Sequence, residues 1–290
     1  MTNDEVSTLK AENVRLIALL EKHGIEWRLP NPAAPVVQKP GATLFSTAQK
    51  VAMFRGLFRG RTDVYPIRWE SKTTGKSGYA PACANEWRAG VCEKPRIKCG
   101  DCTHRLLLPV SDTVIYDHLA GKHTVGVYPL LEDDSCYFLA MDLDEADWRE
   151  DARAIMLSCA ELEIPAALEI SRSGKGAHVW VFFVSRVSAR DARRLGSAII
   201  SHTCARSRQL KLGSYDRLFP NQDSMPKGGF GNLIALPLQK GPREKDFSVF
   251  VDAKLAPYPD QWAFLDSIQL MPPHDIEPTI LQAKIGRAHV

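Results

Sequence analysis

The sequence predicts an α+β fold whose core is a β-α-β-β-α-β unit between residues 136 and 240. In this region the spacing of the apolar residues changes repeatedly from the period of a strand to that of a helix. The resulting segments follow one another in the split βαβ order of ferredoxin-like and RRM-like folds. Such a unit forms an antiparallel sheet with two helices on one face, which leaves the other face free to carry a functional site.

Six segments make up the predicted unit, and each is inferred from its apolar pattern. In chain order they are strand 136–143, helix 146–162, strands 166–171 and 176–184, helix 188–210 and strand 231–238. In this arrangement the first and third strands are neighbours at the centre of the sheet. Residues on those two strands are therefore expected to lie side by side.

The first 28 residues predict one amphipathic helix that ends near Gly24. An apolar stripe with one asparagine follows steps of three and four residues, as in the a/d seam of a coiled coil: Val6, Leu9, Asn13, Leu16 and Leu20. Asparagine at an a position favours a parallel pair of helices. A homodimer through this helix and a single helix packed on the body both fit the pattern.

Proline-rich stretches flank the predicted globular part. Residues 29–43 contain four prolines and predict an extended linker, and a domain over residues 44–252 follows, beginning with a helix at 45–59. Residues 253–290 contain five more prolines around a short helix at 261–268, so we expect a tail or an interdomain linker. The final IGRAHV matches the translation of a common sequencing-adapter DNA, which favours a natural chain that continues; a short polar tail that ends there is the alternative.

The overall composition is that of an ordinary folded protein. With 44% hydrophobic and 24% charged residues, wholesale disorder is excluded. No apolar run approaches the roughly 20 residues needed to cross a bilayer, and the polar N-terminus lacks the pattern of a signal peptide. We therefore expect a cytoplasmic protein without a membrane partner, whose seven cysteines are thiols or metal ligands rather than disulfides.

Two carboxylates close the first strand of the unit. Asp142 and Asp144 stand two positions apart in FLAMDLDE, so their side chains point to the same face of a strand. Such a pair repels and raises each other's pKa unless a cation lies between them, and Mg²⁺ or Mn²⁺ prefers carboxylate oxygens. A metal site and a strand that runs out into a polar turn are both compatible with this motif.

A polar turn containing glycines leads into the third strand, in SRSGKGAHVWVFF. Glycine lets backbone N–H groups approach an anion, and Arg172, Ser173 and Lys175 add donors beside His178, so the turn suits a phosphate. It is not a P-loop, because no GK[ST] opens a helix. An ordinary hairpin turn followed by an exposed histidine is the alternative interpretation.

A third carboxylate, Asp216, lies in GSYDRLFPNQD, which reads as a loop before the last strand. Because the first and third strands are expected to be neighbours, Asp142, Asp144 and His178 should lie close together. Asp216 arriving from this loop would complete a two-metal site, and a turn aspartate with no ligand is the alternative.

Four cysteines gather within a basic loop as C-x8-C-x6-C-x2-C: Cys83, Cys92, Cys99 and Cys102. Tetrahedral zinc needs four such ligands, so the sequence predicts a zinc knuckle over residues 83–102, inserted into the domain, with His104 as a substitute ligand. Incidental thiols are the alternative. Trp87 and several basic residues surround the cluster, and they could contact the bases and phosphates of a template. A basic loop that is merely solvated is the alternative. The basic residues are Arg88, Lys94, Arg96, Lys98 and Arg105.

The combination of these motifs resembles the archaeo-eukaryotic primase superfamily. DLD at a strand end, SGKGAH opening a later strand, and an Asp followed by NLIALPLQ are similar to its three motifs. The longer stretches ACANEWRAGVCEKPRIKCGDC, HTVGVYPLL and RSGKGAHVWVFF are similar to the primase-polymerase domain of TOTE conflict systems, over residues 45–252.

This resemblance implies a primase-like core and a template-dependent nucleotidyltransferase, a DNA primase-polymerase of DNA replication. Such an enzyme uses single-stranded DNA template and primer, nucleoside triphosphates and two Mg²⁺ or Mn²⁺ ions, and relatives often carry a helicase region after the domain. The matching metal-binding and catalytic positions are Asp142, Asp144 and Asp216. His178 and Ser173 match nucleotide-binding positions, to which charge and location add Arg172 and Lys175.

Two other functions remain open at this point. A non-catalytic, zinc-containing RRM-like nucleic-acid binder would carry aromatic residues on the sheet face where Asp142 and Asp144 are expected. A DxD glycosyltransferase would also hold a nucleotide diphosphate through Mn²⁺, but it needs neither the cysteine cluster nor a third carboxylate.

Overall fold

The computed structural model describes residues 12, 15–16, 18–20, 22–23, 45–144, 147–206 and 213–285. The chain divides into two units, residues 1–41 and 42–290. In the first unit the described residues from Glu12 to Lys22 are helical, and Arg15 is paired with Glu12 at 2.6 Å. The remainder of the helix expected at 1–28 and the linker at 29–43 lie outside the described residues, so the homodimer stays a prediction.

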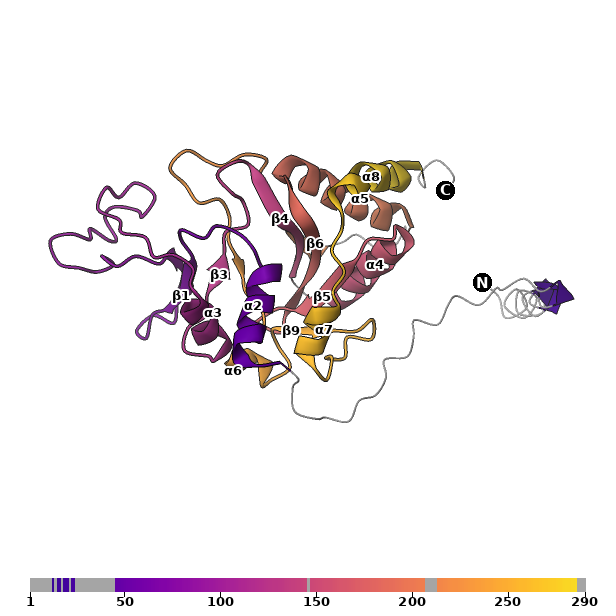
Figure 1. Ribbon diagram of the computed structural model, residues 1–290, viewed down its shortest axis with the longest axis horizontal. Helices are drawn as coiled ribbons and strands as arrows, with labels where there is room; N and C mark the ends of the chain where they lie inside the picture. Colours follow the sequence, from indigo (N-terminus) through magenta and orange to yellow (C-terminus); the bar gives the residue numbers. More distant parts are fainter. Residues whose placement is uncertain are drawn as a thin grey trace. The chain divides into compact units, whose positions relative to one another are not determined.

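The second unit is built on a five-stranded sheet in the order β7-β4-β6-β5-β9, in which all neighbours are antiparallel (Figure 1). Its strands are β4 (Ser135–Asp144), β5 (Ala166–Ile170), β6 (Gly176–Ser188), β7 (Tyr215–Phe219) and β9 (Val249–Val251). The two strands at the centre, β4 and β6, are apolar along most of their length and buried on both faces. The mixed α/β fold expected from the sequence is therefore present, and the first and third predicted strands are neighbours.

Two amphipathic helices cover one face of this sheet. They are α4 (Trp148–Glu161) and α5 (Ala189–Arg206), and each buries one apolar stripe. The contact of α5 is close because Gly196 has no side chain: a Cβ there would lie 2.9 Å from Leu218 and 3.3 Å from Leu139. Leu139, Met141 and Leu143 on β4 therefore face the helices, and Asp142 faces the opposite side.

Aromatic side chains cover much of the opposite face. Helix α2 (Thr47–Leu57) begins with a capping box between Ser46 and Gln49. Phe58, just after the helix, packs edge-on against Trp180 and Phe182 of β6. Both rings are almost completely buried, whereas Asp144, at the end of the same face, is exposed. The open part of this face is thus confined to the strand ends that carry the aspartates.

The last strand of the unit differs from the prediction. Of residues 231–238 only β8 (Ile234–Ala235) is a strand, and it pairs with β3 (Gly126–Val127) in a separate two-stranded sheet. The edge next to β4 is formed by β7, which carries Asp216 and was expected to be a loop. The prediction was wrong because an apolar run indicates that residues are buried, not that they form a strand. Leu236 and Leu238 are buried without belonging to a strand of the main sheet.

The C-terminal region packs on the domain, which the expected tail or linker over 253–290 did not anticipate. Helix α7 (Gln261–Ser267) agrees with the predicted short helix and buries Trp262 and Leu265. A 3-10 turn (Pro273–Asp275) then leads into α8 (Ile276–Ile285), which lies beside α5 (Figure 1) and buries Ile276, Ile280 and Ala283. Five prolines precede or interrupt these apolar positions, so the sequence reads as broken although it contributes to the core.

The remaining elements lie between α2 and β4 or before β9. They are β1 (Pro66–Glu70) and β2 (Ser77–Pro81), which form a hairpin, α3 (Asp112–Leu119) and the short α6 (Lys240–Arg243). Within the described part of the chain, no helix is both long and apolar enough to span a membrane.

Candidate active site

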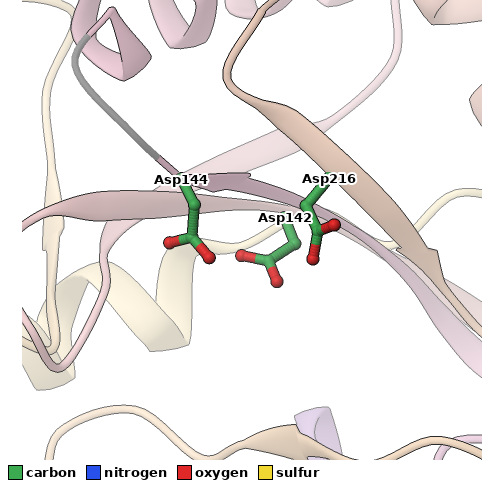
Figure 2. Close-up of side chains that lie close together, drawn as sticks. All are labelled: Asp142, Asp144 and Asp216. Carbon is green, nitrogen blue, oxygen red and sulfur yellow. The ribbon is translucent and has the colours of Figure 1, made fainter.

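Three aspartates meet at one end of the central strands (Figure 2). Asp142 and Asp144 come from β4 and Asp216 from β7, and one carboxylate oxygen of each lies within 4.8 Å of those of the other two. Among the residues that the structure describes, this is the one group of three or more His, Cys, Asp or Glu ligands gathered that closely. The carboxylates expected to converge from the sequence are therefore brought together.

A β-bulge turns the third aspartate toward the other two. On β7, Arg217 pairs with Asp142 and Tyr215 pairs with Leu143, so that Asp216 is an extra residue opposite one step of β4. An extra residue disrupts the regular alternation of side chains and can redirect one of them, which is a common use of bulges beside functional sites. Figure 2 shows the Asp216 carboxylate beside that of Asp142 as a result.

The three negative charges oppose one another. Burial raises the pKa of Asp144 above its usual value, and the charges of Asp142 and Asp216 raise it further. Arg217 offsets part of this repulsion, since its guanidinium contacts Asp216 at 2.5 Å. Oxygen ligands of excess negative charge at this spacing suit Mg²⁺ or Mn²⁺, so the residues present fit such a cation.

Gly176 leaves the space that Asp144 occupies. The two residues pair across β4 and β6. A Cβ at Gly176 would overlap the carbonyl oxygen of Leu143 and lie 2.5 Å from Oδ1 of Asp144. Only glycine at this position is compatible with the observed place of the carboxylate.

His178 is held next to the aspartates by a carboxylate that the sequence analysis did not identify. Nδ1 of His178 lies 2.9 Å from Oε2 of Glu169 on β5, and Trp180 donates its indole N–H to the same oxygen at 2.9 Å. Nε2 of His178 points to Asp142, 3.5 Å away. Burial lowers the pKa of His178, but Glu169 and Asp142 outweigh it and raise the pKa to about 10.

Glu169 has one signal in the sequence, a lone carboxylate in the apolar strand AALEI. It is almost completely buried and stands directly opposite His178 in the ladder. A buried carboxylate is retained only where hydrogen-bond donors compensate for its lost hydration. Its partners, however, come from the next strand, and the sequence alone does not give that register.

The turn between β5 and β6 carries the predicted phosphate ligands. The hydroxyl of Ser173 accepts from the backbone N–H of Lys175 at 3.1 Å and lies 3.0 Å from that of Ser171. Gly174 has a positive φ of 71° and packs against the ring of Phe247, which fixes the turn. Because Gly176, which follows the turn, pairs with Asp144, the turn lies at the same end of the sheet as the three aspartates.

Arg172 of this turn approaches Tyr79 on β2. Burial raises the pKa of Tyr79, and Arg172, in hydrogen-bonding contact with it, lowers that pKa in part. The hairpin of β1 and β2 therefore borders the turn. Tyr79 is a further neighbour of the site that no motif in the sequence indicated.

The four clustered cysteines line one pocket together with His104. All four are half-buried free thiols, and Cys99 also interacts with Lys94. Their sulfur atoms are not gathered as closely as the oxygens of the three aspartates, since no cysteine belongs to a ligand group of 4.8 Å among the described residues. Zinc at this pocket stays a prediction.

Comparison with known proteins identifies the family of this chain. The family model of the archaeo-eukaryotic primase domain of TOTE conflict systems matches residues 49–279. No curated protein matches the chain in sequence. Among solved structures, the polymerase domain from Mycobacterium tuberculosis ligase D in complex with DNA is 14% identical, with 83% of this chain and 90% of that chain covered and a TM-score of 0.36. Because the family model spans most of its length, this chain belongs to the archaeo-eukaryotic primase domain family of TOTE conflict systems.

Proposed function

We propose that this protein is a DNA primase-polymerase, a nucleotidyltransferase that adds nucleotides from nucleoside triphosphates to a strand on a single-stranded DNA template. The observation that carries the proposal is the convergence of Asp142, Asp144 and Asp216 in a chain of this family. Three carboxylates that repel one another at an exposed strand end have no evident role in stabilising the fold. Their convergence is explained if they are ligands for divalent cations.

The residues of the site divide the work of nucleotide transfer. Asp142, Asp144 and Asp216 would hold Mg²⁺ or Mn²⁺, which, when bound, lowers the pKa of an attacking 3′-hydroxyl and stabilises a pyrophosphate leaving group. His178, fixed by Glu169, presents Nε2 on the same side as the carboxylates for contact with a phosphate. The side chains of Ser173, Arg172 and Lys175, in the turn at 171–176, add donors for the triphosphate.

The structure argues against a non-catalytic RRM-like binder. Such proteins stack bases on exposed aromatic residues of the sheet. Here the aromatic residues of that face, Trp180 and Phe182, are buried beneath Phe58. The exposed part of the face carries aspartates, which repel a nucleic-acid backbone unless cations are bound.

Nucleotide incorporation tests the proposal directly. Purified protein is incubated with a single-stranded template, labelled ribonucleoside or deoxyribonucleoside triphosphates, and Mg²⁺ or Mn²⁺, with and without a primer. Extension of the primer, or synthesis without it, supports the proposal and identifies the preferred sugar. Absence of any template-dependent product with either metal and either sugar would refute it.

We further propose that the cysteine pocket binds one structural zinc ion through Cys83, Cys92, Cys99 and Cys102, with His104 as an alternative ligand. Four thiols that share one pocket and form no disulfide support this assignment. Little regular structure stabilises this loop, since within residues 82–107 the structure assigns turns, bends and isolated bridges. A metal would supply the missing cross-links.

Replacing Cys99 and Cys102 together by serine is expected to remove the zinc and increase proteolysis of the loop. Metal analysis of wild-type protein purified without added zinc should find about one zinc ion per chain, and the double variant should retain less than about a tenth of it. Cys204→Ser is the matched control, because Cys204 is an exposed thiol on α5. Folded wild-type protein with no zinc above background would contradict the assignment.

We also propose that two exposed indoles contact the template strand. Trp69 on β1 lies over Gly78, so that one face of its ring is supported and 47% of the residue remains exposed. Trp87 in the cysteine loop is 67% exposed and lies near Lys94, 5.7 Å from the ring centre. Bases stack on such rings without regard to sequence, while nearby lysines and arginines contact phosphates.

Removing either indole is expected to weaken binding of single-stranded DNA. Base stacking on an aromatic side chain contributes about 1–3 kcal/mol, so Trp69→Ala or Trp87→Ala should raise the Kd by about 5- to 150-fold in fluorescence anisotropy. Leu157→Ala serves as control, since Leu157 is an equally exposed apolar residue on α4. Unchanged affinity in both tryptophan variants would exclude these two side chains from the template path.

A further inference from the structure

A buried carboxylate outside the three-aspartate group contacts the residue just before the strand that carries Asp216. Asp151 lies in the first turn of α4 and is 1% exposed. Its Oδ2 accepts two hydrogen bonds from Ser214, from the backbone N–H at 3.1 Å and from the hydroxyl at 2.6 Å. Among the described residues no ion pair involves Asp151, so these bonds and the helix N-terminus compensate for its burial.

Ser214 in turn is joined to the strand of the other two aspartates. Its carbonyl oxygen accepts the backbone N–H of Asp144 at 2.7 Å. Ser214 also precedes Asp216 by two residues. One residue therefore connects α4, the end of β4 and the start of β7, and we refer to Asp151 and Ser214 together as the Asp151–Ser214 clamp.

The clamp acts at the point where the regular ladder ends. Between Asp142 and Leu143 the register of β4 against β7 shifts, and Asp216 is the extra residue of the bulge. The alternation of a regular strand does not determine the direction of a bulged side chain. That direction depends on how the backbone is held on each side, and on the N-terminal side it is held by Ser214.

We propose that Asp151 is a positioning residue that acts through Ser214 to set the separation of the Asp144 and Asp216 carboxylates, and thereby the affinity of the site for a divalent cation. This inference rests on the proposed function of the three aspartates. Asp151 itself does not join the group, because it faces Ser214 on the side of α4. Its proposed role is that of a residue that does not bind the metal itself but orients the side chains that do.

The test is the binding of Mn²⁺ to the full chain, measured by calorimetry without nucleotide or template. Loss of such supporting partners typically costs about 10- to 100-fold in metal affinity, so Asp151→Asn should raise the Kd for Mn²⁺ by about that factor. Asparagine has nearly the same size, but it carries no charge. Ser214→Ala removes one of the two hydrogen bonds and should have a smaller effect in the same direction.

The double variant and a control separate positioning from general damage. If the two residues act through one contact, adding Ser214→Ala to Asp151→Asn should weaken Mn²⁺ binding by less than the product of the single effects. Glu150→Gln, an exposed carboxylate in the same helical turn, should leave the affinity unchanged. The Mn²⁺ concentration that gives half-maximal incorporation should rise in parallel with the Kd.

Wild-type Mn²⁺ affinity in Ser214→Ala and in a folded Asp151→Asn variant would overturn the inference, and if Asp151→Asn does not fold, Ser214→Ala decides alone. Asp142→Ala is measured alongside. If it loses Mn²⁺ while the clamp variants retain it, the inference fails and the proposed function stands. If Asp142→Ala binds Mn²⁺ like the wild type, the three aspartates are not the metal site and both fail.

Discussion

Replacing Asp142 by alanine is expected to abolish nucleotide incorporation, with a loss of at least about a thousand-fold. Asp142 is the central carboxylate of the group, since it stands opposite both Arg217 on β7 and His178 on β6. Loss of a metal ligand removes several kcal/mol of transition-state stabilisation, and each 1.36 kcal/mol corresponds to about tenfold in rate. Single-turnover extension of a labelled primer in Mg²⁺ and in Mn²⁺ measures the effect.

The fold should survive this change. The carboxylates repel one another in the metal-free protein, and the raised pKa of Asp144 means that its ionised form destabilises the folded state. Stability of the metal-free wild type should therefore rise as the pH falls through that raised pKa, and this gain should shrink in Asp142→Ala. Asp133→Ala, which removes an exposed carboxylate just before β4, is the control and should retain activity. Extension by Asp142→Ala within tenfold of the wild type would contradict the assignment.

Substitution of Gly176 by alanine is expected to lower incorporation by about a hundred-fold or more, although the residue touches no substrate. The added methyl group would overlap the carbonyl oxygen of Leu143 and press on Oδ1 of Asp144. The carbonyl cannot yield easily, because it belongs to the central strand pair β4 and β6, so the Asp144 carboxylate should be displaced. Displacement of a reacting group by about 1 Å costs on the order of a hundred-fold in rate, and a steady-state extension assay measures it.

Gly56→Ala is the matched control for this substitution. Gly56 lies in α2, and a Cβ there has no neighbour within 4 Å. Alanine has the higher helix propensity, so this variant should keep full activity and gain a few tenths of a kcal/mol to about 1 kcal/mol in the free energy of unfolding. Full activity and unchanged Mn²⁺ affinity in Gly176→Ala would show that Asp144 tolerates displacement.

The central strands could be predicted from the sequence because their environment leaves a clear pattern. β4 and β6 are buried on both faces and read as continuous apolar runs that end in functional residues, Asp144 at one end and His178 at the start of the other. Placing these two runs side by side required only the split βαβ order. The structure brings Asp142 and His178 into register accordingly.

The strand of Asp216 could not be predicted in the same way. β7 is an edge strand of five residues, and two of them, Asp216 and Arg217, are exposed and charged. Residues 231–238 are more apolar, yet three of them, Leu236, Pro237 and Leu238, are buried as irregular chain. Hydrophobic pattern measures burial, and pairing at a sheet edge leaves little trace in it.

Glu169 and Asp151, which contact residues in or next to the site, could not be identified from the sequence for a different reason. Glu169 is a single acidic residue within an apolar strand, and Asp151 directly follows Glu150 in the first turn of α4, where acidic residues are common. Their partners, His178 and Ser214, are nine and 63 positions away. The meaning of a buried carboxylate lies in its donors, and only the folded chain identifies them.

The aromatic side chains that pack near His178 determine how the candidate site unfolds. Trp180 and Phe182 stack with their rings nearly parallel and lie beneath Phe58, and Trp180 also shares Glu169 with His178. The ladder of β4 and β6 is thus covered on one face by these rings and on the other by α4 and α5. Opening β4 and β6 locally would expose much of the buried apolar core. We therefore expect these strands to unfold together with the rest of the domain in one cooperative transition. The arrangement of Asp142 and His178 should therefore persist until the whole domain melts.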